Sequence, residues 1–139
     1  MNAPLYTTEI LRLAASLPEP LQLDRVDGSA ARRSPTCGSS LLCEVQVKDG
    51  RIEALSQTVL ACAFGQASAA LVAQQAPGRS RDDVVAALDQ LTDWLSGRRQ
   101  EPPQWPGFDA LAPAIPRAGR HGAILLPLRA LVAALEAAA

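Results

Sequence analysis

The chain has 139 residues, of which 48% are hydrophobic and 19% are charged, and its formal net charge is −1. This length and composition predict one globular domain over residues 1–139. The small net charge, with arginines scattered among carboxylates, argues against a surface that binds nucleic acid.

The two ends of the sequence and its cysteine content favour a cytoplasmic protein. The N-terminal segment has Glu9 and Arg12 within its apolar stretch and no basic leader, unlike a signal peptide. The apolar C-terminal stretch is interrupted by Pro127, Arg129 and Glu136 and is short for a membrane span. Three cysteines are an odd number, without the density of a secreted disulfide scaffold. We therefore expect reduced thiols and no membrane contact.

The N-terminal third predicts a short helix followed by an extended segment. Residues 5–16 have a partial apolar face at helical spacing, and Pro18 and Pro20 would end that helix. Residues 21–36 combine weak alternation with turn-forming residues, which favours an edge strand or an extended segment leading into the sheet.

The strongest local signal is a β-hairpin around Asp49-Gly50, a dipeptide that favours the two-residue type I′ turn. Such a turn sets Lys48 opposite Arg51. The same count predicts these pairs: Val47 with Ile52, Val45 with Ala54, Cys43 with Ser56, Leu41 with Thr58. Continued to the open end of the hairpin, it places Cys37 opposite Cys62. A β-bulge near either cysteine would break that opposition.

This register also predicts which side chains share a face, because successive residues of a strand point to opposite sides. The predicted core face comprises Leu41, Cys43, Val45, Val47, Ile52, Ala54 and Leu60. The predicted solvent face comprises Glu44, Gln46, Lys48, Arg51, Glu53 and Gln57.

Three helices are predicted in the C-terminal half. Small residues after Cys62 predict a helix that Pro77-Gly78 ends. The segment Ser80–Ser96 predicts a second helix with Ser80 as its N-cap and Gly97 as its stop. Its buried stripe would be Val84, Leu88, Leu91 and Leu95. The last helix is predicted to begin near His121, with a kink or a late start at Pro127.

The Pro-rich segment 98–118 predicts an ordered loop with one short helical turn around Asp109. Trp105 and Phe108 are interpreted as anchors that pack this loop against the core rather than as a ligand platform.

Cys37, Cys62 and His121 are the residues with the chemistry of a metal site. Opposed residues of an antiparallel pair have Cβ atoms about 4.5–5.5 Å apart, so two thiolates there could bind one metal ion or a small cluster. With the histidine they would give three ligands for zinc or an iron-sulfur unit, and a fourth position would stay open. Cys43, roughly 20 Å along the strand from Cys37, faces the core and is interpreted as a packing residue. A domain in which Cys37 and Cys62 also only pack remains an alternative.

Three stretches resemble, in this order, the scaffold family for iron-sulfur cluster assembly, the IscU, SufU and NifU N-terminal group. They are PTCGSSLLCEVQVKDGRIEAL, ACAFGQASAALVAQQAPGRSRDD and RHGAILLPLRAL. The resemblance implies an α/β (α+β), SufE/NifU-like fold. In this fold a three-stranded antiparallel sheet has helices packed on one face and a cluster site at one end.

The resemblance also implies the site residues and two departures from the family pattern. Cys37, Cys62 and His121 match family ligands, and Cys37 and Cys62 are also candidate sulfur acceptors. Gly122 stands where the family has a third cysteine, and Ser39 where it has an aspartate. The neutral hydroxyl of Ser39 would be at best a weak fourth ligand. The chaperone-docking motif of the IscU branch is replaced by AIPRAGR, which favours the SufU or NifU branch or a divergent paralogue.

The leading hypothesis is a non-enzymatic scaffold or carrier that binds iron, a [2Fe-2S] cluster or zinc through Cys37, Cys62 and His121. Its expected partners are a cysteine desulfurase and apo iron-sulfur target proteins. One alternative is a paralogue that docks on a desulfurase or a target without assembling clusters. Another is a SufU-like, zinc-bound sulfur acceptor in which one of the two cysteines carries persulfide.

Overall fold

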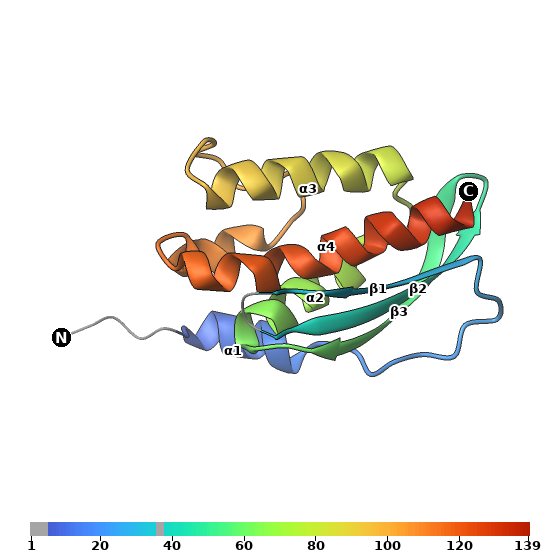
Figure 1. Cartoon of the computed structure of the whole chain (residues 1–139), viewed down its shortest axis with the longest axis horizontal. Helices are drawn as coiled ribbons and strands as arrows, with labels where there is room; N and C mark the ends of the chain where they lie inside the picture. The colour runs from blue at the N-terminus through green and yellow to red at the C-terminus, as the bar shows by residue number, and fades with distance from the viewer. Residues whose placement is uncertain (1–5, 36–37) are drawn as a thin grey trace.

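The computed structural model describes residues 6–35 and 38–139, which form helices packed on a small sheet (Figure 1). The elements in chain order are α1 (Thr8–Ala15), β1 (Gly28–Arg33), β2 (Ser40–Lys48), β3 (Arg51–Leu60), α2 (Ala63–Gln75), α3 (Arg81–Leu95), the 3₁₀ helix η1 (Phe108–Ala114) and α4 (Ala118–Ala138).

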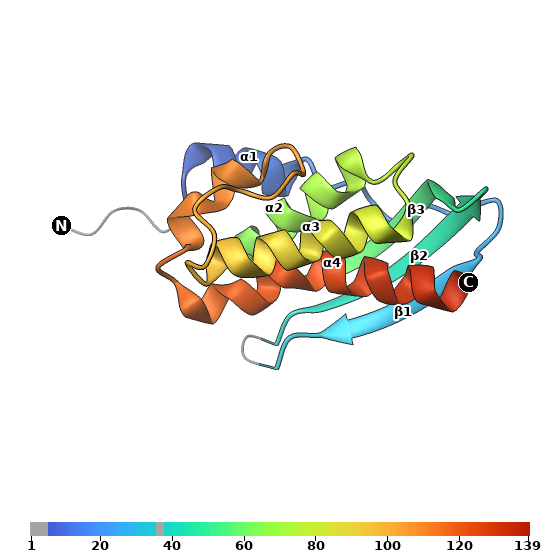
Figure 2. The ribbon, with the colours of Figure 1, turned by 90° about the horizontal axis from the view of Figure 1, so that it is seen from above.

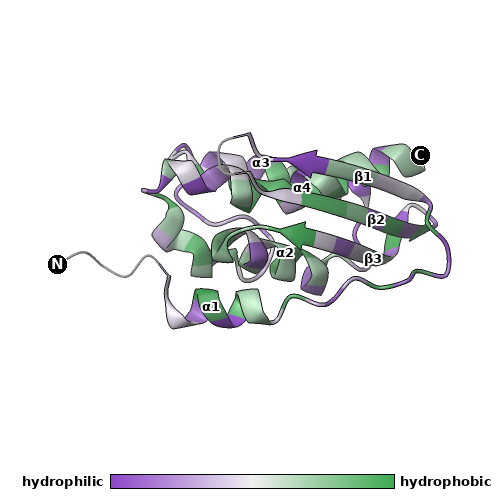
Figure 3. Ribbon diagram, turned by 60° about the horizontal axis from the view of Figure 1, so that its bottom comes forward, coloured by the Kyte–Doolittle hydropathy of each residue, from purple (hydrophilic) through white to green (hydrophobic). Residues whose placement is uncertain are grey.

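The three strands form an antiparallel sheet in the order β1-β2-β3. Helix α4 packs on β1 and β2, and α2 packs on β3 and beside α4. Helix α3 contacts α4 on the side away from the sheet (Figure 2). Figure 3 looks onto the opposite face, where the strands lie in front of α2, α3 and α4. The predicted α+β fold, with a three-stranded antiparallel sheet and helices on one face, is confirmed.

The predicted hairpin register is correct only next to the turn. Asp49 and Gly50 both have positive φ, as a type I′ turn requires, and Lys48 pairs with Arg51. Between Val47 and Gln46 the register shifts by one residue, because β3 contains an extra residue, Glu53. The observed pairs beyond this β-bulge are Gln46 with Ala54, Val45 with Leu55, Cys43 with Gln57 and Leu41 with Val59. The predicted pairs Val45–Ala54, Cys43–Ser56 and Leu41–Thr58 are therefore wrong.

The bulge reverses the faces of β3, as one extra residue must. Gln57, predicted to face solvent, is 6% exposed, and its side-chain amide donates to the carbonyl of Ala69 in α2 at 3.0 Å. Leu55 is buried in the core in place of Ala54. Leu60, predicted to face the core, is 71% exposed. On β2, where the register has no extra residue, the core face is as predicted.

The boundaries of the first elements are later than predicted. Helix α1 begins at Thr8, because the Thr7 side chain accepts the backbone N–H of Ile10 and caps the helix there. The extended segment becomes the edge strand β1 only from Gly28. A Cβ atom at Gly28 would overlap the carbonyl oxygen of Ala134 in α4, so this strand lies directly against that helix.

The interpretation of α3 and of the Pro-rich loop is confirmed. Ser80 and Asp83 form a reciprocal capping box at the start of α3. Trp105 and Phe108 are buried, and the Trp105 indole N–H donates to the carbonyl of Leu71 at 2.9 Å. The helical turn predicted around Asp109 is η1.

Helix α4 starts at Ala118, three residues before His121, and continues through Pro127, so the late start considered for this helix is wrong. By length and composition this helix could cross a membrane, but 56% of its apolar 18-residue stretch is buried inside the protein. It is therefore a core helix that lies across the sheet.

Candidate functional site

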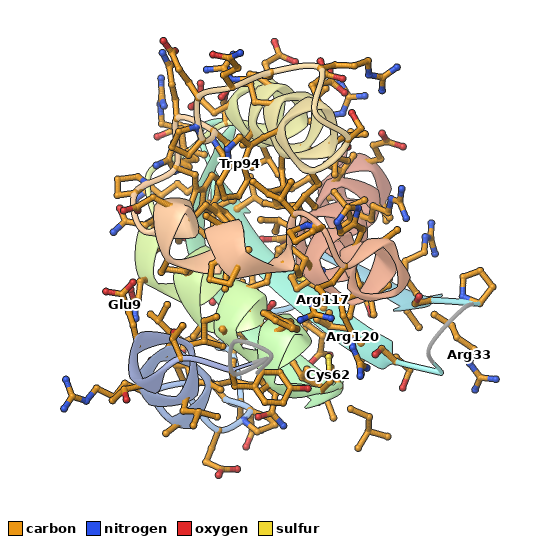
Figure 4. The ribbon with its side chains drawn as sticks, turned by 90° about the vertical axis from the view of Figure 1, so that its left-hand side faces the viewer. Glu9, Arg33, Cys62, Trp94, Arg117 and Arg120 are labelled. Carbon is orange, nitrogen blue, oxygen red and sulfur yellow. The ribbon has the colours of Figure 1, made fainter. Side chains whose placement is uncertain are left out.

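Cys62 lies at the junction between the sheet and α2, at the end of the molecule that faces the viewer in Figure 4. It follows the end of β3 by two residues and is the N-cap of α2, with extended backbone angles (φ −67°, ψ 174°). Its side chain makes no capping hydrogen bond, and the half-buried thiol is free. The thiol is therefore available to bind a metal or to react.

The first turns of α2 and α4 pack against each other at this end. A Cβ atom at Gly65 would lie 3.3 Å from the carbonyl oxygen of Ala123. One turn further along α2, the Ser68 hydroxyl donates to the carbonyl of Ile124 at 2.6 Å and is fully buried. Gly65 is three residues after Cys62, and Ala123 is two residues after His121. The fold thus brings the cysteine and the histidine to neighbouring helix starts.

The imidazole of His121 is oriented by two backbone carbonyls. Its Nε2 atom lies 2.9 Å from the carbonyl oxygens of both Ala114 and Ile115, at the end of η1. Because carbonyl oxygens only accept hydrogen bonds, Nε2 carries the proton in this arrangement. The neutral ring then has its lone pair on Nδ1. Histidines that bind metals commonly donate their other ring N–H to a backbone carbonyl in this way.

The family pattern also singles out Gly122 and Ser39. Gly122 is next to His121 in the sequence, and Ser39 lies in the connection between β1 and β2. Gly122 follows His121 in the first turns of α4 and has no side chain to offer a ligand. Ser39 is buried, and its carbonyl accepts the backbone N–H of Ser34 at 2.8 Å, which closes the connection between β1 and β2.

Cys37 lies outside the described residues, and so does its predicted opposition to Cys62. The β2–β3 ladder ends at the pair Ser40–Leu60, and the register that led to the prediction is shifted by one residue along that ladder. Among residues 6–35 and 38–139, no three histidine, cysteine, aspartate or glutamate side chains gather closely enough to hold a metal ion. The described residues therefore offer Cys62 and His121 as candidate ligands. Their sulfur and nitrogen donors fit iron or zinc.

Cys43 has the opposite environment to Cys62. It is fully buried in the core, as predicted. Burial raises the pKa of its thiol from 9.0 to about 12, and the nearby Glu44 carboxylate adds to the effect. Cys43 is therefore a packing residue and not a ligand.

Two features of this end were missed at the level of sequence. The first is the contact of His121 with the two carbonyls at the end of η1. The second is the pair Arg117 and Arg120, which lie near Cys62 in Figure 4. The run RAGRH carries the signal for the second feature, because it places both arginines within four residues of the histidine. No comparable local signal exists for the first.

Comparison with known proteins gives matches among solved structures. The fold is similar to that of a NifU-like protein (N-terminal) from Brucella abortus, with a TM-score of 0.89 and 27% identity over 96% of this chain and 93% of that one. It is also similar to a putative iron-sulfur cluster assembly scaffold protein for the SUF system from Fervidobacterium islandicum. That match has a TM-score of 0.77 and 17% identity over 94% of this chain and 96% of the other.

No protein-family model matches the sequence, and no curated protein matches it. The structural matches nevertheless cover nearly the whole chain. They confirm the resemblance predicted from the sequence: the chain has the fold of the NifU/IscU/SufU-like scaffold family.

Proposed function

We propose that this protein is a NifU-like scaffold or carrier for iron-sulfur cluster assembly, with iron or a [2Fe-2S] cluster as its cargo and zinc as the alternative metal. The proposed ligands are Cys37, Cys62 and His121, with Ser39 as a weak fourth position. The proposed partners are a cysteine desulfurase that supplies sulfur and apo proteins that receive the cluster. In this role the protein binds and transfers but does not catalyse a reaction of its own.

The observation that carries this proposal is the packing of the first turns of α2 and α4. This packing brings the free thiol of Cys62, at the N-cap of α2, and the imidazole of His121 to one end of a NifU-like fold. The Nε2 atom of that imidazole is already hydrogen-bonded to a backbone carbonyl. The thiolate of Cys62 and the Nδ1 lone pair of His121 are donors that iron accepts. The carbonyls of Ala114 and Ile115 hold the ring through Nε2. A metal can therefore bind Nδ1 without breaking either of these hydrogen bonds.

Anaerobic reconstitution with ferrous iron and sulfide tests the proposal. We expect the parent protein to bind iron and to develop the visible absorbance of a thiolate-bound cluster, and Cys37→Ala and Cys62→Ala to lose most of both. Cys43→Ala is the matched control, because it removes a buried core thiol that lies opposite Gln57 of β3, five residues before Cys62 in the sequence. Equal iron binding by the parent, Cys37→Ala and Cys62→Ala would rule the proposal out.

A single conservative variant, His121→Gln, tests the histidine without disturbing the fold. The side-chain amide of His121→Gln can still donate to the carbonyls that now accept from Nε2, but it offers no ring nitrogen to a metal. We expect the free energy of unfolding of this variant to lie within about 1 kcal/mol of that of the parent, and its affinity for metal to be lost. A His121→Gln protein that binds iron as tightly as the parent would remove His121 from the ligand set.

A second candidate is a paralogue that docks on a desulfurase or a target without assembling clusters. The observation in its favour is Gly122, which leaves the start of α4 without the third thiol of the family pattern. This candidate predicts no bound metal by elemental analysis and partner binding that is insensitive to Cys37→Ala and Cys62→Ala. The scaffold hypothesis predicts instead that elemental analysis finds bound metal.

A further inference from the structure

A hollow of about 210 Å³ lies between β3 and residues 18–21, in the segment that follows α1. Figure 3 shows this segment leaving α1 and running along the β3 edge of the sheet. The apolar residues that line the hollow are Pro18, Leu21, Ala54, Leu55, Ala73 and Pro77. Neither Cys62 nor His121 is among the described residues that line it, so the hollow is not part of the candidate metal site.

Gln57, which also lines the hollow, carries a buried hydrogen-bond acceptor without a partner. Its side chain is 6% exposed, and its Nε2 atom donates to the carbonyl of Ala69 at 3.0 Å. Because a carbonyl only accepts, this contact settles which end of the amide is the oxygen. Among the described residues, that oxygen, Oε1, is the one buried side-chain polar atom with no hydrogen bond. It therefore needs a donor that these residues do not supply.

The β-bulge at Glu53 is the reason that Gln57 points inward. Without the extra residue, the alternation from the turn would turn Gln57 to solvent. Bulges re-aim side chains in this way and are frequent next to functional sites. A position that served packing alone would favour an apolar side chain, because a buried polar group with one unpaired atom is destabilising. Glutamine at this position therefore points to a bound molecule.

The outer wall of the hollow is held to the sheet by one hydrogen bond. In the described chain, the bond that joins residues 18–21 to β3 runs from the Leu21 N–H to the Ser56 hydroxyl, at 2.8 Å. Pro18 and Pro20 have no backbone N–H to add another, and Leu21 is 57% exposed. Solvent does not reach the unpartnered oxygen in this arrangement. A small outward movement of this wall would give a molecule in the hollow access to it.

The charge of the lining restricts which molecules fit. Glu19 and Glu53 line the hollow, and none of the described residues that line it is a lysine, arginine or histidine. Glu53 pairs with Arg25 at 3.2 Å, whereas Glu19 forms no ion pair within the described ranges. An anion would therefore be repelled, and the unpartnered oxygen requires an N–H or O–H group. An apolar cavity of about 150 Å³ accommodates benzene, so this hollow has room for one ring.

We infer that the hollow binds a small uncharged molecule that combines one apolar ring with one O–H or N–H donor. The ring packs against the apolar lining, and its donor bonds to Oε1 of Gln57. Free phenols and indoles are the simplest molecules of this class. The inference does not depend on the proposed function, because it uses none of the proposed metal ligands.

Titration of the metal-free, isotope-labelled protein with phenol, followed by amide NMR, tests the inference. We expect saturable binding that shifts the amides of residues 53–57 and of Glu19, Leu21 and Ala73, which line the hollow. Toluene is the matched ligand, because a methyl group replaces the hydroxyl. Benzoate, an anion without a donor at neutral pH, should not bind.

Gln57→Met keeps the length of the side chain and removes the amide. We expect this variant to bind phenol about tenfold more weakly than the parent, as the loss of one hydrogen bond to a buried acceptor predicts. Its affinity for toluene should not fall. Gln74→Met makes the same change at an exposed position of α2 outside the hollow and should bind phenol as the parent does.

Ala73→Leu supplies a second test that leaves Gln57 in place, and it decides the matter if Gln57→Met does not fold. The larger side chain fills the hollow from α2 and should abolish the binding of both phenol and toluene. Thermal unfolding of each variant, measured without ligand, shows whether it is folded.

Four results would overturn the inference. Phenol does not bind the parent saturably, or it shifts only amides outside the hollow. Folded Gln57→Met binds phenol as tightly as the parent, or folded Ala73→Leu does. A crystal structure of the protein grown with phenol that shows an ordered water as the donor to Oε1, and no phenol in the hollow, would have the same consequence.

Discussion

The two cysteines of the described chain sit in opposite environments, and their reactivity should differ accordingly. The Cys43 thiol is buried, and its pKa is raised from an ordinary 9.0 to about 12. At pH 8 its thiolate fraction is therefore roughly 1,000-fold lower than that of a thiol with the ordinary pKa. Iodoacetamide should therefore label Cys62 in the native protein and reach Cys43 only in urea. Mass spectrometry of the labelled peptides checks this, and native labelling of Cys43 at the rate of Cys62 would contradict the assigned environments.

The carboxylate of Asp27 makes the fold sensitive to acid. It accepts the backbone N–H of Val47 at 2.7 Å and pairs with Arg25, and the first of these contacts is the main reason that its pKa is lowered from 3.8. The stabilisation is present above pH 3.8 and is lost as the pH falls through the lower, folded-state pKa. Urea unfolding should show that the free energy of unfolding falls less steeply between pH 6 and pH 2.5 for Asp27→Asn than for the parent. Parallel curves would contradict this prediction.

The bulge at Glu53 shows where sequence patterns stop predicting an element. The Asp49-Gly50 turn specifies the pairs next to it by its own geometry, and those pairs are correct. The extra residue lies next to Ile52, whose backbone N–H and carbonyl bond to residues 79 and 78 of the loop before α3. These bonds join segments that are remote in sequence. Periodicity within the hairpin therefore gives no sign of the shift, or of the buried position of Gln57.

The close contact between α2 and α4 depends on Gly65. A Cβ atom there would lie 2.6 Å from the Cβ of Ala61 and 3.3 Å from the carbonyl of Ala123, so the turn that carries Cys62 would have to move. We expect Gly65→Ala to lower the free energy of unfolding by about 1–3 kcal/mol and to weaken iron binding. Chemical denaturation and the reconstitution assay measure the two effects.

Gly119→Ala is the control for helix propensity, since a Cβ atom at Gly119 in α4 meets nothing within 4 Å. This substitution should raise the free energy of unfolding by roughly 0.5–1 kcal/mol. If Gly65→Ala were as stabilising as Gly119→Ala, the packing of the two helix starts described above would be wrong.

On the scale of the whole molecule, the site lies where the end of the sheet, the start of α2 and the start of α4 meet. The fold class was implied by the family resemblance of three sequence stretches, and the structural matches confirm it. The histidine was singled out by its match to the family motif, but its orientation could not be predicted. It depends on the contact of His121 with the carbonyls of Ala114 and Ile115 at the end of η1, and the predicted helical turn gave no sign of that contact.

The central claim is that this end of the molecule binds a metal or cluster through Cys62 and His121 together with Cys37. Elemental analysis of the protein purified without oxygen, beside Cys62→Ala and Cys43→Ala purified in the same way, tests it most directly. The account predicts about one equivalent or more of iron or zinc in the parent and in Cys43→Ala, and little in Cys62→Ala. Metal that is absent from the parent, or retained in full by Cys62→Ala, would contradict it.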